Sequence, residues 1–576
     1  MVLRRLRTLC LLVLIPLVLP AQEKILHARK IDVPIVVDGV IDSVWQTADS
    51  AADYFQMQPY YAKPPLHRTV AKVLTDDDAL YCLMLCYERR EEIQTIAGLL
   101  DQADGEVVSI MLDTFNDKKS AYKFALAASG VKSDARLLDD ARNRDYSWDG
   151  IWFGATKLYD WGFVAEFKIP YRSIRYDASA QSWGLDFDRW IGQSKEDLYW
   201  NAYEQNAGQR ISQFGKLIFD SFHPSLTGLN LEVYPVALAK ARYLSGSKYK
   251  IDPNAGIDIF YNPSEKLTFQ LTANPDFAQI EADPFAFNIT RYETHFDERR
   301  PFFTEGSEVF TASGRDRSTG FYRPLELLYT RRIGKLLPEG AQVPLEVGTK
   351  AFSRVGGWEY GAFYAHTEET DYQSSGVPAQ EPRASFMAAR VKRTILENSS
   401  VGVLFAGKAA DGRLDGVLDL DGAFRTPDWQ LSYQLARSIQ DGRGDFAGSA
   451  GFISISKTWL SFVRLRAIGN QFDVNEVGYV PWIGTTESAF ITGPIWRPAT
   501  GAVSQVLFYS GVEVNYKDVE LHTDHSFILG YNMQFRDNWG FEIDLSAGKS
   551  KDRGIAYNSF EVDLSNFYNI SPRWDA

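Results

Sequence analysis

The sequence predicts an all-β protein in two parts, an N-terminal β-sandwich followed by an antiparallel transmembrane β-barrel. Composition is the first indication: aromatic residues make up 14% of the chain, glycine occurs 43 times and mean hydropathy is negative, unlike a helical membrane protein. The second is a change of pattern at the linker-like stretch SFHPSLTG, residues 221–228. Short strands broken by Asp and Gly precede it, as in soluble sandwiches. Strands that alternate with a period of two follow it, as in barrels.

The N-terminus is typical of an export signal. Three arginines between residues 4 and 7 precede the apolar run Leu9–Leu19, and Pro20-Ala21 offers a cleavage point. We therefore expect a signal peptide over residues 1–21, the sandwich over 22–222 and the barrel over 223–576. No later apolar stretch is long enough to form a membrane helix. The net charge of −13 and the pI near 5.2 argue against a nucleic-acid partner, which would require a basic tract.

Turn signals divide the first half into strands. Residues 36–48 (VVDGVIDSVWQTA) begin as a strand, turn at Asp38-Gly39 and continue into a short helix-like stretch that carries Trp45. The Asp-rich turn at residues 76–78 and the turn Asn116-Asp117 each join two strands. We expect Trp45 to lie in the core.

Two cysteines lie on one predicted strand of the sandwich. Cys82 and Cys86 are four residues apart in ALYCLMLCYE, which corresponds to roughly 13 Å at the usual rise of a strand. That separation is beyond disulfide reach. We expect two free, buried thiols.

The second half alternates cleanly and has two kinds of connection. Very short turns precede four tryptophans, and longer connections such as 368–383 and 470–481 lie between them. The four tryptophans are Trp358, Trp429, Trp459 and Trp539. Tight turns with an aromatic girdle on one side and long loops on the other are typical of outer-membrane barrels. A last tight turn precedes Trp574, so a new strand begins where the sequence stops, and we expect a fragment or an atypical end with the barrel incomplete in this chain.

One connection of the predicted barrel is exceptionally long. Strands are predicted at about 229–243, 256–261 and 267–273, and the next convincing strand is 343–354. If the sandwich is periplasmic, the connection 274–342 begins at the outer mouth. Its aromatics argue against disorder, and its balanced charges fit a polar lumen, so we expect a luminal plug. Its signature residues are Asp276, Glu281, Asp283, Arg291, Glu298, Arg299, Arg300 and Glu305.

Two groups of residues resemble known families. VVDGVIDSVWQTA, LTDDDALYCLMLCYE, MLDTFNDKKSAY and GFVAEFKIPY resemble family 9-like carbohydrate-binding modules. NPDFAQIEADP, RYETHFDERRPFFTEGSEVF and LLYTRRIG resemble an uncharacterised outer-membrane family in which such a module precedes a barrel of unknown function. The resemblance implies a binding-module fold, glycan affinity and no established activity. Together with the barrel pattern, we expect the bacterial outer membrane as the location, with the N-terminal domain in the periplasm. Gly105-Glu106 departs from the paired aspartates that relatives often carry, which puts an inherited metal or polar contact there in doubt.

Sugar binding requires flat aromatic faces and polar side chains that catch hydroxyls. The candidates are two clusters in the first half: Trp148, Asp149 and Trp152 in YSWDGIW, and Trp200 with Asn201 in DLYWNAYEQN. For each tryptophan the competing interpretation is a place in the sandwich core, which large aromatics usually take.

No cofactor is expected, and calcium is a weak alternative. Asp113, Asn116 and Asp117 in one turn and residues 76–78 in another supply oxygen ligands. Both sets stand where turns require polar residues anyway, and neither has the spacing of an EF-hand.

The function favoured by these patterns is glycan or oligosaccharide binding coupled to capture or passage at the outer membrane, with membrane lipid as the second partner. One alternative is a hydrolase of glycosidic bonds that serves carbohydrate catabolism. The acids of the plug are interleaved with arginines, which lower a carboxyl pKa where a general acid requires a raised one. Motifs for a nucleophile elbow, a phosphate loop or a zinc helix do not occur in the sequence. The other alternative is a structural or assembly protein of the cell envelope.

Overall fold

The computed structural model describes residues 23–146, 148–220, 223–225, 229–244, 248–275, 293–315, 320–338, 342–396, 398–441 and 443–568. The expected signal peptide and the turn before Trp574 lie outside these ranges. The described chain is nearly all β and forms two large sheets and one separate hairpin. Its helices are all too short or too polar to cross a bilayer.

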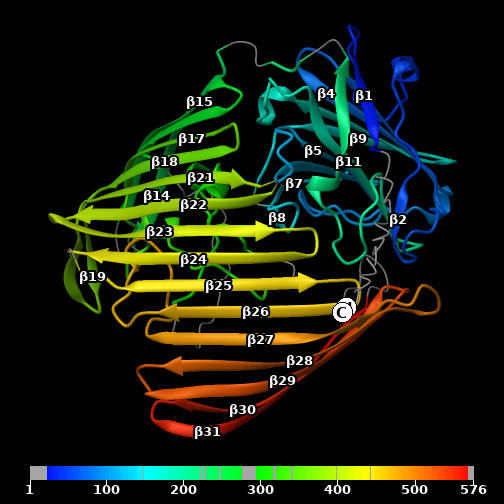
Figure 1. Cartoon of the computed structure of the whole chain (residues 1–576). Coiled ribbons are helices and arrows are strands. Elements are labelled where there is room, and N and C mark those ends of the chain that lie inside the picture. Colours follow the sequence, from blue (N-terminus) through cyan, green and yellow to red (C-terminus); the bar gives the residue numbers. More distant parts are fainter. Residues whose placement is uncertain are drawn as a thin grey trace, which may run out of the picture.

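The first sheet forms the sandwich, at the upper right of Figure 1. Its strand order is β8-β7-β6-β5-β11-β13-β1-β3-β4-β10-β9, and β12 joins β11 to β2. The pairs of β1 with β13 and β3 are parallel. The strands are β1 (Ile25–Lys30), β2 (Phe55–Gln58), β3 (Thr69–Thr75), β4 (Ala79–Tyr87), β5 (Val107–Asp113), β6 (Ala121–Ala127), β7 (Lys132–Leu138), β8 (Asn143–Asp145), β9 (Phe153–Tyr159), β10 (Gly162–Pro170), β11 (Ser182–Ile191), β12 (Glu196–Tyr199) and β13 (Gly215–Asp220). Short 3₁₀ turns are η1 (Ser43–Thr47), η2 (Arg90–Glu92), η3 (Tyr171–Ser173) and η4 (Ile211–Gln213).

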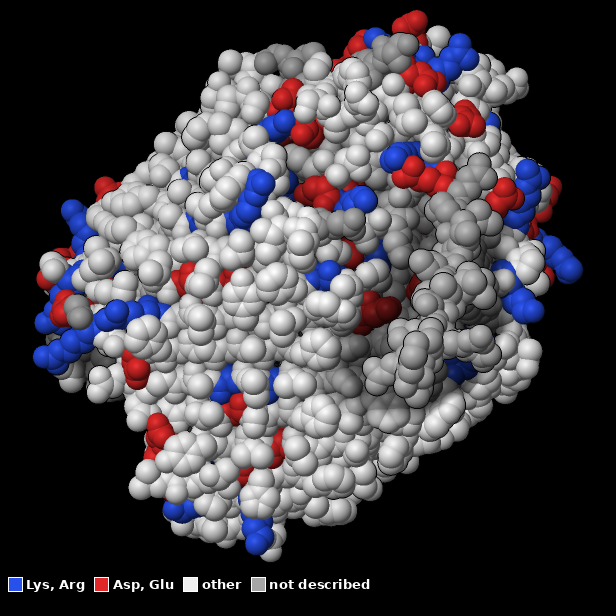
Figure 2. All heavy atoms as spheres, viewed as in Figure 1, with Lys and Arg blue, Asp and Glu red and all other residues white. Residues whose placement is uncertain are grey.

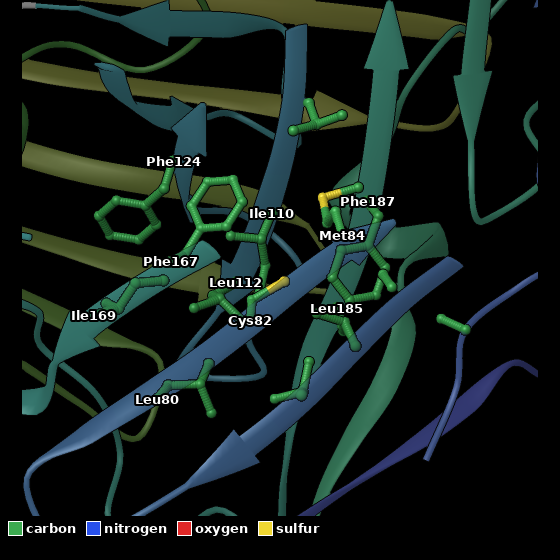
Figure 3. Close-up of a cluster of buried hydrophobic side chains, with 14 of the residues drawn as sticks. Leu80, Cys82, Met84, Ile110, Leu112, Phe124, Phe167, Ile169, Leu185 and Phe187 are labelled. Atoms are coloured by element: carbon green, nitrogen blue, oxygen red, sulfur yellow. The ribbon is translucent and has the colours of Figure 1, made fainter. Parts of the chain in front are cut away.

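A continuous apolar core holds the sandwich together. Strand β4 is buried on both faces, which explains its unbroken apolar sequence. Figure 3 shows Leu80, Cys82 and Met84 of β4 packed among side chains from β5, β6, β10 and β11. Cys82 and Cys86 are free and buried, as predicted. Trp45 lies in η1 with 1% exposure, also as predicted, and its indole Nε1 donates to Glu166.

The second sheet has sixteen strands in sequence order, each antiparallel to its neighbour, with β14 and β31 at its edges in the described chain. The strands are β14 (Leu231–Leu244), β15 (Lys248–Ser264), β16 (Leu267–Ala273), β17 (Leu345–Val355), β18 (Trp358–Thr367), β21 (Ala384–Ile395), β22 (Ser399–Ala410), β23 (Arg413–Arg425), β24 (Trp429–Gln440), β25 (Phe446–Ile455), β26 (Trp459–Ile468), β27 (Thr485–Trp496), β28 (Val503–Lys517), β29 (His522–Phe535), β30 (Trp539–Asp552) and β31 (Ile555–Tyr568). The hairpin of β19 (Thr370–Ser374) and β20 (Val377–Glu381) stands apart.

The predicted turns and strands of this sheet are largely confirmed. Each of the four tryptophans after a tight turn is the first residue of a strand: β18, β24, β26 and β30. The connection 368–383 contains the hairpin of β19 and β20. Strand β15 is longer than predicted. Residues 248–255 carry charges and Pro253, which resemble a loop in the sequence, yet they pair along β14.

The two faces of this sheet differ in polarity. On β24, Gln430, Ser432 and Gln434 are buried, whereas Leu431 and Leu435 are exposed. Exposed apolar side chains continue across the outer face, including Tyr364, Val403, Leu418, Leu465, Phe490, Phe508 and Val512. Figure 2 shows a broad uncharged area over the sheet, with charged residues gathered along its left margin. The outer face is therefore apolar and the inner face polar.

The chain between β16 and β17 packs against the inner face. We call its described residues, 293–315 and 320–338, the inner segment. It contains α1 (Pro301–Thr304), η6 (Ser307–Val309) and η7 (Thr330–Arg332). Phe302, Phe303 and Phe310 share one buried cluster with side chains of β17, β18 and β21.

Candidate functional site

Two spaces in the structure bear on function. A cavity of about 1610 Å³ lies between the sandwich, the inner segment and the inner face of the sheet. A smaller pocket of about 680 Å³ lies on the sandwich itself, beside Trp161. Of the site residues predicted from the sequence that the structure describes, Glu298 lines the cavity, and none lines the pocket beside Trp161.

The tryptophans predicted to stack on sugars lie in the sandwich core. Trp148, Trp152 and Trp200 are 7%, 2% and 4% exposed. Trp152 stacks on Phe167 with ring centroids 5.8 Å apart, and its Nε1 donates to Asp134 at 2.8 Å. Trp200 packs edge-on against Phe187. The structure thus places all three where the competing interpretation put them, and their faces contact protein instead of solvent.

The polar partners of these tryptophans differ in exposure. Asp149 is exposed. Asn201 is buried, and both its backbone N–H and its Nδ2 donate to Asp186 Oδ1, at 3.0 and 2.8 Å. Asn201 therefore donates hydrogen bonds to a buried carboxylate, and its buried side chain is not accessible to a ligand.

An exposed aromatic group that the sequence reasoning did not select lies at the turn between β9 and β10. Trp161 is 37% exposed and stacks on Tyr159, with centroids 5.2 Å apart and an interplanar angle of 18°. Tyr87, at the end of β4, lies 5.0 Å from the same ring. The pocket beside Trp161 is lined by His67, Glu88, Arg89, Glu92, Asp160, Gln193 and Ser194. In the sequence, the position of Trp161 directly after the turn residue Asp160 could have indicated that this ring is exposed.

A buried ionic group lies behind this pocket. Arg189 Nη2 is 2.7 Å from Glu88 Oε2 and 3.9 Å from Glu106 Oε2, and all three side chains are inaccessible to solvent. Among the described residues, Glu88 Oε1 and Glu106 Oε2 have no hydrogen-bond partner. Burial and the neighbouring Glu88 raise the pKa of Glu106 to about 8. At the position where relatives often carry paired aspartates, Gly192 N donates to Glu106 Oε1 at 2.9 Å.

The turns proposed as weak calcium sites are closed by their own backbone. Asp113 Oδ2 accepts from Lys118 N at 2.8 Å, and Asp76 Oδ1 accepts from Asp78 N and Ala79 N at 2.8 Å. These are the bonds of ordinary polar turns. In the part of the chain that the structure describes, no group of three His, Cys, Asp or Glu is arranged to hold a metal ion.

Half of the signature residues of the long connection can be located. Asp276, Glu281, Asp283 and Arg291 lie outside the described residues. Arg300 forms a two-bond pair with Glu298, with Nε to Oε1 at 2.8 Å and Nη2 to Oε2 at 2.6 Å. Burial alone would raise the pKa of Glu298, but Arg300 and Thr330 lower it below its ordinary value. Arg299 is exposed, and its backbone N–H donates to Glu298.

Glu305 faces the sandwich. Its Oε1 lies 2.6 Å from Arg175 Nη2 and its Oε2 lies 3.7 Å from Arg136 Nη2. Burial would raise the pKa of Glu305, but Arg136, Arg175 and Lys350 lower it. Glu298 and Glu305 are thus both favoured in the ionised form. Arg300, an arginine of the same segment, has this effect on Glu298, whereas the arginines at Glu305 come from the sandwich.

Two families match this chain. Residues 37–221 match the family described as carbohydrate family 9 binding domain-like, and residues 227–347 match a domain of unknown function, DUF5916. The two matched regions follow one another along the chain. The DUF5916 match extends from just before β14 to the start of β17, and so includes the inner segment. The family 9-like match covers most of the sandwich.

Distant likenesses to solved structures accompany these matches. A family 9 carbohydrate-binding module from Caldicellulosiruptor kristjanssonii, in complex with cellotriose, has 18% identity and a TM-score of 0.26 and covers 34% of this chain and 93% of its own. A putative carbohydrate-binding protein from Bacteroides uniformis has 12% identity and a TM-score of 0.28 and covers 34% and 100%. OprD from Pseudomonas aeruginosa has 9% identity and a TM-score of 0.26 and covers 84% and 98%. No curated protein matches.

Proposed function

We propose that this chain is an outer-membrane protein that binds glycans through its sandwich and holds the inner segment in the lumen of a barrel. The observation that carries the membrane assignment is the polarity of the sixteen-stranded sheet, with apolar side chains outward and polar side chains inward. A soluble protein rarely exposes so wide an apolar face. In a bilayer that face meets lipid, and the polar face lines the lumen.

The orientation follows from where the sandwich contacts the sheet. Asn206 Nδ2 donates to Asp428 Oδ1 at 2.8 Å, in the turn before β24. Lys457, in the turn before β26, pairs with Glu204 at 2.9 Å. Both contacts fall on the tight-turn end of the sheet. Because outer-membrane barrels have their short turns on the periplasmic side, these contacts support a periplasmic position for the sandwich.

The pocket beside Trp161 is the site that we propose for the glycan. Trp161 supplies an exposed ring next to Tyr87, and Glu92, Asp160 and Gln193 supply polar groups for hydroxyls. The resemblance of residues 37–221 to carbohydrate-binding domains supports this assignment.

The pocket faces away from the barrel. It lies where β10 begins, at Gly162 paired with Tyr87, whereas β10 ends at Pro170, just before Arg175, which contacts the inner segment. A long glycan can therefore bind in the periplasm without displacing the sheet.

The hydrolase alternative gains no support from the inner segment. Glu298 and Glu305 are paired with arginines and have lowered pKa values, the reverse of what a general acid requires. Passage of a solute remains a proposal supported by the cavity of about 1610 Å³ beside the inner segment.

Glycan binding is tested by calorimetry on the full chain in detergent, with cello-oligosaccharides and a panel of other neutral oligosaccharides. We expect binding by one class, weakened at least about tenfold in Trp161→Ala, because a sugar loses its stacking surface. Trp358→Ala is the matched control, since Trp358 is equally exposed (39%) but lies on the sheet. Binding by no member of the panel, or equal weakening by both substitutions, would contradict the proposal.

A further inference from the structure

The inner segment is held from the sandwich side by two arginines. Arg136, on β7, pairs with Glu308 and lies 3.7 Å from Glu305. Arg175, after β10, lies 2.6 Å from Glu305. These side chains come from a strand and a loop of one domain and converge on one short stretch, residues 305–308. We call these ion pairs of Arg136 and Arg175 with Glu305 and Glu308 the grip.

The grip is set among aromatic rings, and its Arg136–Glu308 pair is little exposed to water, whereas Arg175 and Glu305 are 22% and 31% exposed. The guanidinium of Arg136 lies 5.7 Å from the centre of the Trp148 ring, and that of Arg175 lies 3.9 Å from the centre of the Phe352 ring. The side chains of Arg136 and Glu308 are 8% and 11% exposed. Trp148 thus supports an arginine of the grip, which explains a buried tryptophan at this loop.

The sheet also contacts this stretch. Lys350 Nζ, on β17, donates to the carbonyl oxygens of Phe302 and Glu305. The sandwich also contacts the sheet around this point, through Arg354 with Asp117 at 3.1 Å and Lys119 with Glu359 at 3.9 Å. The inner segment therefore contacts charged side chains of both the sandwich and the sheet. It directly connects two strands of the sheet, β16 and β17, whereas the sandwich holds it through side-chain contacts.

Space for movement lies next to the grip. The cavity of about 1610 Å³ is bounded by Lys119 of the sandwich, Glu308 of the inner segment and Lys350 of the sheet. The lumen is thus incompletely filled on the side where the grip lies. Withdrawal of the sandwich would leave Glu305 and Glu308 without their arginines, and charges that lose their partners in poorly hydrated surroundings destabilise the structure around them.

We propose that the sandwich is a latch for the inner segment: Arg136 and Arg175 keep residues 305–308 in the lumen, and their release frees the segment and opens the barrel. This inference rests on the proposed function, because it assumes that the inner face lines a membrane lumen. It adds a regulatory role to the sandwich that is separate from the pocket beside Trp161.

The test compares the full chain with an Arg136→Gln/Arg175→Gln variant and with Lys216→Gln. Lys216 is the matched control because it forms an exposed ion pair, with Glu23, on the same domain. Hydrogen exchange of residues 296–310 is measured in detergent, and single-channel conductance in planar bilayers. We expect exchange at least about tenfold faster in the double variant only, since local opening sets the exchange rate, with a matching gain in open-channel events.

Glu305→Gln tests the same contact with the sandwich unaltered, and exchange of β4 and β24 reports whether each variant is folded. We expect this variant to accelerate exchange of residues 296–310 as well. Unchanged exchange of residues 296–310 in both folded variants would overturn the latch. Faster exchange with no conductance in any variant would show that the two arginines hold the segment, but would overturn the claim that their release opens the barrel.

Discussion

At the scale of single residues, the sandwich buries three charged side chains together. Glu88 and Glu106 share Arg189 in a space closed to solvent. Two carboxylates beside one guanidinium leave one negative charge uncompensated, so burial and mutual repulsion favour a proton on the pair. The pKa of Glu106 is accordingly raised to about 8. This group links the stability of the sandwich to pH.

Stability should decline as pH rises through about 8, and Glu106→Gln should reduce that decline. The pKa of Glu106 is higher in the folded state than in the unfolded state, so its contribution is complete below the unfolded value and is lost as pH rises through about 8. The melting temperature of the full chain and of the variant is measured from about pH 6 to about pH 9. Glu23→Gln, at an exposed side chain, is the control. Equal slopes for all three proteins would contradict this account.

The tryptophans of the sugar-binding prediction are buried in the sandwich core, which the local sequence did not indicate. Trp148 and Trp152 lie in YSWDGIW, which resembles an exposed loop. Their burial depends on Phe124 and Phe167, on other strands, which the local sequence does not reveal. The pairing of Arg136 with Glu308 joins residues far apart in the chain, so spacing could not predict it.

At the scale of elements, alternation along each strand decides which side chains meet. Arg390 on β21 and Asp421 on β23 both point to the inner face and pair at 2.7 Å with no solvent exposure. Asp421 also accepts from the backbone N–H of Ser313 in the inner segment at 2.7 Å. The neighbour Val391 points outward and is 41% exposed. One strand thus presents a buried charge and an exposed apolar side chain in succession.

Arg390→Leu should destabilise the sheet by about 3–5 kcal/mol, because it leaves Asp421 buried without its cation. Val391→Ala, one residue away on the opposite face, should change the free energy of unfolding by less than about 1 kcal/mol. Urea unfolding of both variants in detergent measures the difference. A similar decrease in the free energy of unfolding in the two variants would show that Arg390 and Val391 do not lie on opposite faces as assigned.

The elements of the second sheet were predictable because their signals are local. Alternation and a tryptophan after each tight turn gave the starts of β18, β24, β26 and β30 correctly. Residues 248–255 were missed because charges and Pro253 usually mark a loop, whereas here they pair along β14 in a two-stranded extension. An alternating apolar pattern arises only where one face of a strand packs against a core or a membrane, so a strand without such a face is not recognised from its local composition.

At the scale of the whole molecule, one end of the sheet is closed by a second domain. The contacts of the sandwich fall on the tight turns before β22, β24 and β26, through Asn398, the backbone of Thr426, and Lys457. The family matches describe the two parts separately, and neither sequence pattern predicted how they meet. The charged contacts between them bring the sandwich against the inner segment.

The central claim is that the outer face of the sheet meets lipid while its inner face encloses the inner segment. Spin labels at Leu435 and Gln434, adjacent residues of β24 with 60% and 1% exposure, test it most directly in lipid vesicles. We predict that the label at Leu435 is relaxed by oxygen dissolved in the bilayer and not by a water-soluble nickel complex. We predict that the label at Gln434 is little relaxed by either. Relaxation of the Leu435 label by the nickel complex would show that this face meets water, and would contradict the account.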